Sequence, residues 1–277
     1  MKFDLNQSAK EHVLVVAHRG QSGGNIPCNT FPAYEAALMQ GADMLETDVT
    51  ACADGTLFIF HPRMEPAFLK IDRRINDMTA EEVKTLRYVN QDDKPTQFGL
   101  MTFDEFLETY KDRCYINVDK FWDNPEAIAK AIKRHNMQEQ IVVKSTLSEN
   151  VLAVLEQVAP ELAFMPVVKD VFPEHEALKK RNIHYIGVEV LFASDQAEVA
   201  SEAFMEKMHK DGKLVWANSI IYDVRKQLTG GHSDDTALTE SRENSWGWLA
   251  DRGFDLIQTD WTMMVVDFLK KTNRYYR

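Results

Sequence analysis

Two histidines and three carboxylates stand where apolar, β-like runs of the sequence end. They are His18 in His-Arg-Gly, Glu46 and Asp48 in Glu-Thr-Asp, His61, and Asp119 in Asn-Val-Asp. If these runs are strands of one parallel barrel, the polar groups meet at one mouth, where barrel enzymes keep their active sites. Two imidazoles beside a carboxylate-bound divalent cation could cleave a phosphate ester without a protein nucleophile.

The carboxylates have the spacing of a cation site. Glu46 and Asp48 are two residues apart on a predicted strand, so their side chains point to the same face. Two such carboxylates repel each other unless a proton or cation lies between them. One divalent cation, Mg²⁺ or Ca²⁺, would suit these oxygen ligands, and Asp119 on the next barrel strand is placed as a third. The simpler alternative is a pair of salt bridges at the rim.

Each histidine can be interpreted as catalytic or as a residue without a catalytic role. His18 directly follows the run Val-Leu-Val-Val-Ala and is expected to point into the barrel mouth, although it could be a structural histidine bonded to a backbone carbonyl. His61 follows the return strand of a predicted hairpin, which would bring it beside Glu46 and Asp48. The alternative for His61 is an exposed histidine at the end of the hairpin.

Basic side chains near the same strand ends could hold a phosphate. The formal net charge is −11, so an anionic substrate needs a local cluster of positive charge. Lys144 is the preferred phosphate contact and Lys120 the second, with Arg19 adding charge; each lysine could instead be a solvated rim residue. Glu189 could bind a substrate hydroxyl or Lys144. Trp216 could line a small-molecule pocket or belong to the core.

Apolar, β-branched runs alternate with helical patterns, which indicates parallel βα units. The predicted strands are Val13–Ala17, Met44–Val49, Tyr115–Val118, Ile141–Val143, Leu162–Val167, Tyr185–Val190, Leu214–Ala217 and Leu256–Gln258. The predicted helices are Thr30–Gln40, Pro125–His135, Glu149–Val158, Pro173–Arg181, Glu198–Lys210, Ser245–Arg252 and Thr262–Tyr275. The fold class is therefore α/β: a single TIM (β/α)8 barrel domain over residues 1–277, with an insertion at 50–113 between the second and third strands.

Three segments outside this regular pattern have their own interpretations. The insertion contains a hairpin that turns at Asp54-Gly55 and two short helices opened by capping boxes, Thr79 with Glu82 and Thr102 with Glu105. The connection at 220–244 would overhang the barrel mouth, and its His232 and Asp234-Asp235 could bind metal, although a solvated loop is the simpler interpretation. The tail at 273–277 is interpreted as the end of the last helix.

Bulk properties narrow the class of protein. An acidic chain with a pI near 5.2 is a poor binder of nucleic acid. The three cysteines are widely spaced and odd in number, which indicates neither a disulfide framework nor a zinc site and fits a reducing compartment. The sequence shows no signal peptide and no membrane span. We therefore expect a cytoplasmic protein with a small-molecule partner and no stable membrane insertion; the oligomeric state does not follow.

The ordered motifs resemble the glycerophosphodiester phosphodiesterase family of phospholipase-C-like TIM barrels. The matched runs are HRG, NTFPAYEAALMQGADMLETDV and DGTLFIFH, followed by INVD, VVKS, KLVWAN and GFDLIQTD. The resemblance implies that His18 and His61 are the acid/base pair, that Arg19 contacts phosphate, and that Glu46, Asp48 and Asp119 bind the metal. It also implies that a hydroxyl of the substrate attacks phosphorus, that a cyclic phosphate forms, and that water then opens it.

Three positions depart from the family pattern and leave the substrate open. Cys28 stands where the family usually has Glu, Pro62 follows the second histidine in place of Asp, and Lys120 directly follows Asp119 and is therefore expected on the other strand face. Glycerophosphocholine-type diesters are the default substrates, with sugar or polyol phosphodiesters as an alternative. Two further alternatives are a non-catalytic barrel that binds phosphodiesters and another metal-dependent barrel enzyme such as an aldolase or isomerase.

Overall fold

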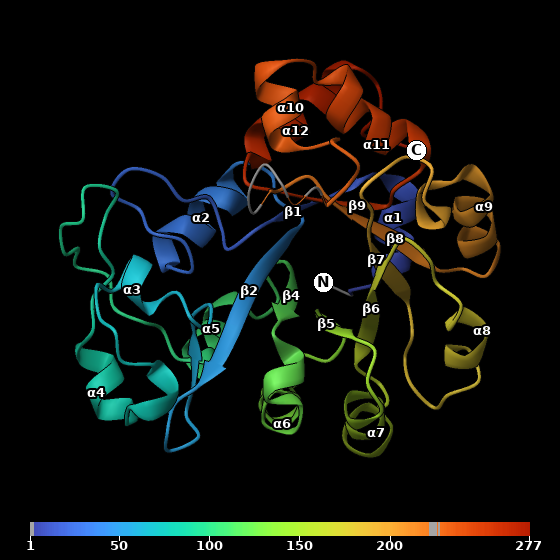
Figure 1. Ribbon diagram of the computed structural model, residues 1–277. Coiled ribbons are helices and arrows are strands. Elements are labelled where there is room, and N and C mark those ends of the chain that lie inside the picture. Colours follow the sequence, from blue (N-terminus) through green and yellow to red (C-terminus); the bar gives the residue numbers. More distant parts are fainter. Residues whose placement is uncertain (1–2, 222–225, 227) are drawn as a thin grey trace.

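The structure is a computed structural model that describes residues 3–221, 226 and 228–277. In this described part of the chain, eight parallel strands form a barrel: β1 (Leu14–Ala17), β2 (Met44–Ala51), β4 (Tyr115–Asp119), β5 (Ile141–Thr146), β6 (Ala163–Lys169), β7 (Gly187–Leu191), β8 (Leu214–Asn218) and β9 (Leu256–Thr259). β1 pairs with both β2 and β9, which closes the ring. Figure 1 shows the strands around the barrel and the helices outside them. The predicted TIM barrel is confirmed, and each predicted strand overlaps an observed one.

Alternation along each strand separates an inner from an outer core. Leu14 and Val16 of β1 pack inside the barrel with Trp216 of β8. Val15 and Ala17 pack with residues of the surrounding helices. Because both faces of a barrel strand are covered, the strands begin with apolar residues, and polar side chains such as Glu46, Asn117 and Glu189 come in only from their third residue on. The inward-facing row of each strand then continues into the polar residues of the barrel mouth.

The outer helices follow the predicted order. In the described residues they are α2 (Phe31–Met39), α6 (Pro125–His135), α7 (Glu149–Val158), α8 (His175–Leu178), α9 (Glu202–Lys210), α11 (Trp248–Arg252) and α12 (Thr262–Lys271). The prediction for α8 is too long, since the helix covers only the middle of 173–181. The predicted end of the last helix is also wrong. After α12 the backbone turns at Asn273, whose φ is 57°, and Tyr275 accepts a hydrogen bond from the N–H of Val13.

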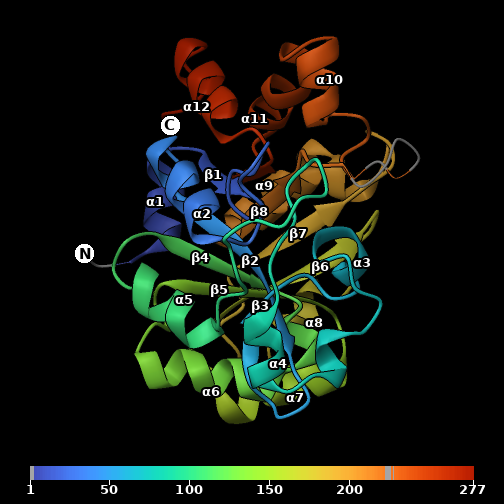
Figure 2. The same ribbon diagram turned by 90° about the vertical axis from the view of Figure 1, so that its left-hand side faces the viewer.

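The segment between β2 and β4 forms one flank of the molecule. It contains β3 (Leu57–Ile59), which pairs antiparallel with β2, and the helices α3 (Glu65–Phe68), α4 (Ala80–Thr85) and α5 (Phe103–Tyr110). Both predicted capping boxes form, at the start of α4 and of α5. Figure 2 shows β3, α3 and α4 together on this flank. The hairpin extends β2 beyond the barrel and returns the chain toward its mouth.

Among the described residues, three α-helices have no counterpart in the prediction: α3, in the insertion, and α1 and α10. α1 (Leu5–Glu11) begins after Asp4, whose carboxylate accepts from Gln7 N–H, and it packs Leu5 against the inner core. α10 (Asp234–Thr239) begins after Ser233 within the predicted long connection at 220–244. Residues 222–225 and 227 of that connection lie outside the described residues, so its expected position over the mouth is described only in part.

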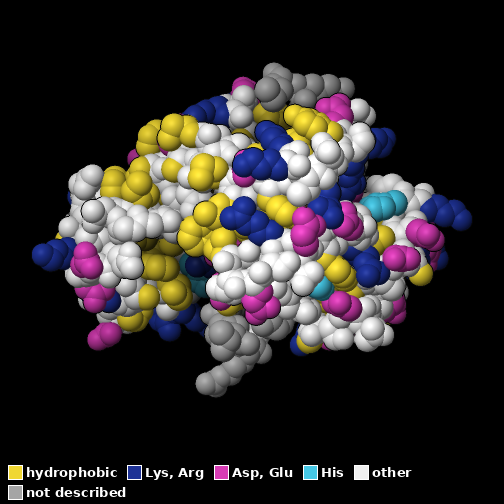
Figure 3. Space-filling view, turned by 90° about the horizontal axis from the view of Figure 1, so that it is seen from above, with side chains coloured by type: hydrophobic (Ala, Val, Ile, Leu, Met, Phe, Trp, Pro, Cys, Tyr) yellow, Lys and Arg dark blue, Asp and Glu magenta, His cyan; other side chains and the backbone are white. Residues whose placement is uncertain are grey.

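The surface carries charges of both signs. On the face shown in Figure 3, acidic and basic side chains are interspersed with hydrophobic ones. Among the described residues, the structure has no helix with the length and apolar character needed to cross a membrane. Acidic side chains are therefore not segregated from basic ones on the face of Figure 3.

Candidate active site

Two buried carboxylates of β2, Glu46 and Asp48, form a cluster with the partly buried Asp119 at the end of β4. The register pairs Asp48 with Asp119, while Glu46 and Asp48 share the inward face of β2. One oxygen of each of the three side chains lies within 4.8 Å of the other two. The predicted convergence of these side chains is therefore present in the structure.

The electrostatics of this cluster are those of crowded carboxylates. Burial, together with the charges of Asp48 and Asp119, raises the pKa of Glu46 to about 7. Burial also favours the neutral form of Asp119, but the charges of Lys120 and Lys144 outweigh it and lower the pKa of Asp119 to about 2. Asp48 Oδ1 is buried without a hydrogen bond from the described residues. A cation bound by the three carboxylates would relieve their repulsion and use this oxygen, so the donor set fits a hard divalent metal.

Arg19, which lies just after β1, contacts two of the three carboxylates. Its Nε lies 2.8 Å from Asp48 Oδ2, and its backbone N–H donates to Glu46 at 2.9 Å. Its backbone is left-handed, with φ 55°, and Gly20 follows with φ 77°. A Cβ on Gly20 would lie 2.7 Å from the backbone of Ala33, so only glycine fits there. A salt bridge, which was the simpler alternative to a cation site, thus exists between Arg19 and Asp48 within the carboxylate cluster.

His18 is oriented by a carboxylate that follows the last strand. Its Nδ1 lies 2.8 Å from Asp260 Oδ1. A carboxylate oxygen accepts, so Nδ1 carries the proton and Nε2 is the nitrogen available for proton transfer. Burial lowers the pKa of His18, but the hydrogen bond and charge of Asp260, with the charge of Glu46, outweigh it and raise this pKa.

His61 has a different partner and the opposite shift. Its Nδ1 donates to the carbonyl oxygen of Pro62 at 2.8 Å, which again leaves Nε2 for proton transfer. Burial lowers the pKa of His61, and the charge of Asp48 only partly offsets it. Around the ordinary pKa of histidine, the protonated form is therefore favoured at His18 and the neutral form at His61.

The expected direction of Lys120 is wrong. Its Nζ lies 2.6 Å from Asp119 Oδ2 and 3.8 Å from Asp48 Oδ1, on the side of the cluster. The physical reason is that β4 ends at Asp119 and Lys120 is left-handed, with φ 60°, so the alternation of a strand no longer applies. Lys120 adds positive charge beside the carboxylates.

Lys144 lies deeper and is already paired. Its Nζ is 2.5 Å from Glu189 Oε2 and 4.1 Å from the centre of the Trp216 ring. Glu189 also accepts from Asn218 at 2.6 Å, and Trp216 is fully buried. Glu189 thus contacts Lys144, one of its two predicted partners, and Trp216 occupies the core position that was its alternative. Through its charge, Lys144 favours the ionised form of Asp119.

Several supporting residues had no role in the site in the sequence analysis. Asn29 donates to Asp48 Oδ2 at 3.2 Å, and Tyr34 donates to Asn29 Oδ1 at 2.8 Å. Asp234, the first residue of α10, accepts from the backbone N–H of Asp260 at 2.9 Å. The sequence signal for Asn29 is its position after the His-Arg-Gly loop. Asp234 was noticed only as a possible metal ligand, and its carboxylate is instead used by hydrogen bonds.

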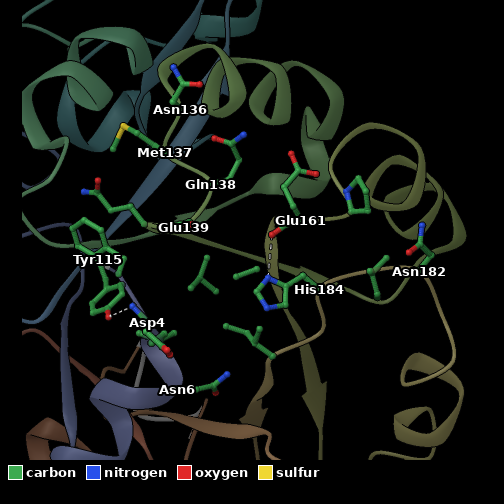
Figure 4. A pocket seen from close by; sticks show the side chains of 18 of the residues that line it. Asp4, Asn6, Tyr115, Asn136, Met137, Gln138, Glu139, Glu161, Asn182 and His184 are labelled. Atoms are coloured by element: carbon green, nitrogen blue, oxygen red, sulfur yellow. Dashed lines mark hydrogen bonds between the residues drawn. The ribbon is translucent and has the colours of Figure 1, made fainter. Parts of the chain in front are cut away.

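A cavity of about 640 Å³ adjoins His18 and Asp260 and extends to Phe68 and Trp261. A larger pocket of about 1000 Å³ lies at the opposite, amino-terminal end of the strands. Figure 4 shows that polar side chains surround it and that two of its hydrogen bonds, Asp4 to Tyr115 and His184 to Glu161, lie within its own wall. The candidate catalytic residues are therefore at the other end of the barrel from the larger pocket.

A second group with possible metal ligands comprises His175, Glu176 and Asp211. The His175 ring already bonds Tyr185 and Asp211, and Lys179 Nζ lies 2.6 Å from Asp211. Since these groups neutralise and satisfy one another, we assign no chemistry to this group.

Comparison with known proteins places these features in one family. The Glycerophosphoryl diester phosphodiesterase family matches residues 18–263. A glycerophosphodiester phosphodiesterase from Caldanaerobacter subterraneus is 30% identical over 54% of this chain and 64% of its own length. An uncharacterized protein, YqiK of Bacillus subtilis, is 26% identical over 92% of this chain and 98% of its own.

Solved structures share the fold at lower identity. A glycerophosphoryl diester phosphodiesterase from Parabacteroides distasonis has a TM-score of 0.80 at 16% identity, covering 98% of this chain and 94% of that one. A phosphodiesterase from Oleispira antarctica, in complex with the product sn-glycerol-3-phosphate, has a TM-score of 0.69 at 20% identity, covering 94% and 97%.

Proposed function

Because the chain belongs to the glycerophosphoryl diester phosphodiesterase family, we propose that it is a metal-dependent phosphodiesterase acting on glycerophosphodiesters. The products would be glycerol 3-phosphate and an alcohol, with glycerophosphocholine-type diesters as default substrates. The observation that carries the proposal is one cluster in which Arg19 contacts both Glu46 and Asp48 beside two histidines of opposite pKa shift.

In this proposal Glu46, Asp48 and Asp119 hold one Mg²⁺ or Ca²⁺. When bound, the ion neutralises charge on the phosphodiester and acts as a Lewis acid. Arg19 and Lys120 add positive charge beside the same carboxylates, which would offset the repulsion between an acidic chain and an anionic substrate.

The histidines move the protons. His61, held neutral by burial, takes the proton of a neighbouring substrate hydroxyl at Nε2 as that oxygen attacks phosphorus. His18, held protonated by Asp260, gives a proton from Nε2 to the leaving alkoxide. The cyclic phosphate formed in this way is opened by water with the two roles exchanged. Lys144 forms a buried ion pair with Glu189, and its charge favours the ionised form of Asp119. To contact the phosphate directly, Lys144 would have to break this ion pair.

Turnover of a small panel of phosphodiesters tests the proposal. Glycerophosphocholine and a chromogenic diester would be incubated with Mg²⁺, Ca²⁺ or EDTA. Metal-dependent release of glycerol phosphate is expected. Cleavage of the chromogenic diester alone would support phosphodiester cleavage but contradict glycerophosphodiesters as the substrates. No cleavage by folded, metal-binding protein would favour a non-catalytic phosphodiester-binding barrel.

Removal of either imidazole gives the sharpest check on the mechanism. His18→Ala or His61→Ala should lower kcat by at least about 100-fold, because general acid–base catalysis contributes about 10²–10⁴-fold. Steady-state rates at saturating metal measure this effect, and circular dichroism controls for folding. Near-normal turnover by either variant would exclude the two-histidine mechanism.

We further propose that residues 1–277 act as one domain and that the protein works in the cytoplasm. The closed barrel and its shared cores support the first statement. Three free cysteines, Cys28, Cys52 and Cys114, support a reducing environment. Fractionation with thiol labelling in cells would test the location.

A further inference from the structure

We propose that the cavity beside His18 receives the leaving alcohol of the substrate, and that this alcohol is uncharged and carries an apolar alkyl or aryl group. The inference rests on the proposed phosphodiesterase function and deepens it. It places an apolar alcohol before choline and before polyols as the leaving group. The lining residues that set this preference are Ile26, Cys28, Phe68, Val89 and Trp261.

The cavity lies on the side of the leaving group. In the proposed mechanism the bond from phosphorus to the attacking oxygen forms while the bond to the leaving oxygen breaks, and His18 Nε2 gives the leaving oxygen its proton. His18 lines the cavity together with Asp260, its hydrogen-bond partner, and Arg19, which is paired with Asp48. His61, which takes the proton of the attacking hydroxyl, is not among the described residues that line it. The leaving alcohol is therefore the part of the substrate that this cavity can hold.

Apolar side chains from separate parts of the chain contribute to the walls. Ile26 follows β1, Phe68 ends α3, Val89 follows α4 and Trp261 follows β9. The Trp261 side chain is 42% exposed although it is large and apolar, so a ligand that covers it would gain free energy from its burial. The volume of about 640 Å³ is in the range of small-molecule sites and leaves room for an alcohol larger than choline.

The acidic groups of the cavity are already paired with cations. Among its described lining residues, the carboxylates are those of Asp93 and Asp260. Asp260 Oδ1 lies 2.8 Å from His18 Nδ1, and Asp93 Oδ1 lies 2.7 Å from Lys70 Nζ. Asp93 and Lys70 are also exposed, so water and salt screen their charges. A quaternary ammonium group would lose hydration on entering this cavity without gaining an unpaired carboxylate as its partner.

Cys28 gives the cavity an uncharged wall at a position where the family usually has Glu. Cys28 is a free, half-buried cysteine that lines the cavity. Burial raises the pKa of its thiol to about 12, so the group is neutral at physiological pH. A neutral thiol behaves as a small apolar group. This chain therefore lacks the charge of a carboxylate at a position from which it would attract a cationic alcohol.

The test compares two diesters of glycerol phosphate whose leaving alcohols have the same shape, choline and its carbon analogue 3,3-dimethylbutanol, with saturating Mg²⁺ or Ca²⁺. Only the charge differs between them, which is needed because aromatic rings attract cations as well as apolar groups. We expect kcat/KM of the wild type for the dimethylbutyl diester to equal or exceed that for glycerophosphocholine. Intrinsic reactivity works against this expectation, because the ammonium group makes choline the more acidic alcohol and the better leaving group.

Cys28→Glu adds the missing charge, and Cys28→Gln is its matched control. In Cys28→Glu, the ratio of kcat/KM for the dimethylbutyl diester to that for glycerophosphocholine should fall at least about tenfold, because the carboxylate attracts only the cation. In Cys28→Gln, which adds nearly the same shape without the charge, the ratio should stay at the wild-type value. Because both substrates are measured with the same variant, the ratio cancels changes in folding, in metal binding and in the common chemical step.

Trp261→Ala tests the apolar contact separately. It should raise KM for the dimethylbutyl diester at least about fivefold and change kcat little, because this contact is present in ground and transition states alike. Met263→Ala is the control, since it removes an apolar side chain of α12 that is 56% exposed and lies outside the described lining of the cavity. It should leave KM unchanged.

A wild-type kcat/KM that is lower for the dimethylbutyl diester than for glycerophosphocholine would overturn the inference. Equal ratios in Cys28→Glu and Cys28→Gln, or an unchanged KM in Trp261→Ala, would also overturn it, while leaving the phosphodiesterase function intact. Cleavage of neither diester by folded, metal-binding wild type would instead contradict the proposed function itself.

Discussion

At the scale of single residues, the pKa values of the two histidines shift in opposite directions, and their Nδ1 atoms have different hydrogen-bond partners. Asp260 offers His18 a full negative charge, and Pro62 offers His61 a neutral carbonyl. Burial lowers the pKa of both rings, but Asp260 outweighs it at His18, whereas the charge of Asp48 and the Pro62 carbonyl offset it only in part at His61. These opposite pKa shifts are the ones that the proposed mechanism needs, in which one ring accepts a proton while the other donates one.

Asp260→Asn should change the pH dependence of catalysis. We expect a bell-shaped profile of kcat/KM, with a lower limb from protonation of His61 below its ordinary pKa and an upper limb from deprotonation of His18 above it. Asparagine keeps a hydrogen-bond acceptor but removes the charge, so the pKa of His18 should fall and the upper limb should move to lower pH. Rates measured between pH 5 and 9 at fixed ionic strength would show this shift.

The control for this experiment is Asp267→Asn, which removes an exposed carboxylate paired with Lys271 on α12. Its profile should match the wild type. An upper limb that stays in place in Asp260→Asn would show that Asp260 does not set the proton affinity of His18. A lower rate without a shift would indicate a loss of ring orientation alone.

At the scale of elements, α10 connects the segment after β8 to the end of β9. The buried carboxylate of Asp234 accepts from the hydroxyls of Ser219 and Thr259, from Trp246 Nε1 and from the backbone N–H of Asp260. These donors come from three different parts of the chain around the carboxyl ends of β8 and β9. The position of Asp260, and through it that of His18, therefore depends on a helix that carries no catalytic group.

Asp234→Asn should weaken this connection. The amide has one acceptor oxygen in place of two, and its N–H₂ group would face donors, so at least one buried donor would lose its partner. We expect the free energy of unfolding to fall by about 1–3 kcal/mol, as measured by urea denaturation, together with a lower kcat. Asp235→Asn changes the exposed neighbour in the same helical turn and should alter neither quantity. Equal stability of the two variants would show that Asp234 does not hold the strand ends together.

The same elements show how far sequence reasoning reaches. The spacing of Glu46 and Asp48 predicts a shared face because side chains alternate strictly within a strand. Lys120 follows the last residue of β4, where a left-handed backbone replaces that alternation, and its direction was mispredicted for this reason. The bond from His18 to Asp260 joins residues 242 positions apart and exists only because β1 closes the barrel on β9. The local sequence pattern predicts where each strand ends, but the closure of the barrel decides which strand ends lie in contact.

At the scale of the whole molecule, an acidic chain places three carboxylates together at the site proposed to receive an anion. The barrel directs three carboxylates inward at one mouth, and Arg19, Lys120 and Lys144 only partly neutralise them. Burial, together with the charges of Asp48 and Asp119, raises the pKa of Glu46 from 4.5 to about 7. Ionisation of Glu46 therefore costs the folded state stability, and this cost grows as the pH rises from 4.5 to about 7 and is fully present above that.

This cost makes a prediction that needs no substrate. Metal-free wild type should lose thermal stability as the pH rises from 4.5 to about 7 and lose no more from this group above that, and Glu46→Gln, which stays neutral and can still accept from the N–H of Arg19, should lose less. Mg²⁺ or Ca²⁺ should restore the wild type at pH 8, by about 2.7 kcal/mol when the free ion is 100 times its Kd. Glu46→Gln should gain much less from the ion. Melting temperatures at about pH 5 and pH 8, with and without metal, separate these cases. Equal stabilisation of both proteins by the ion would place the cation elsewhere, because a ligand stabilises the fold only through the site that it occupies in the folded state.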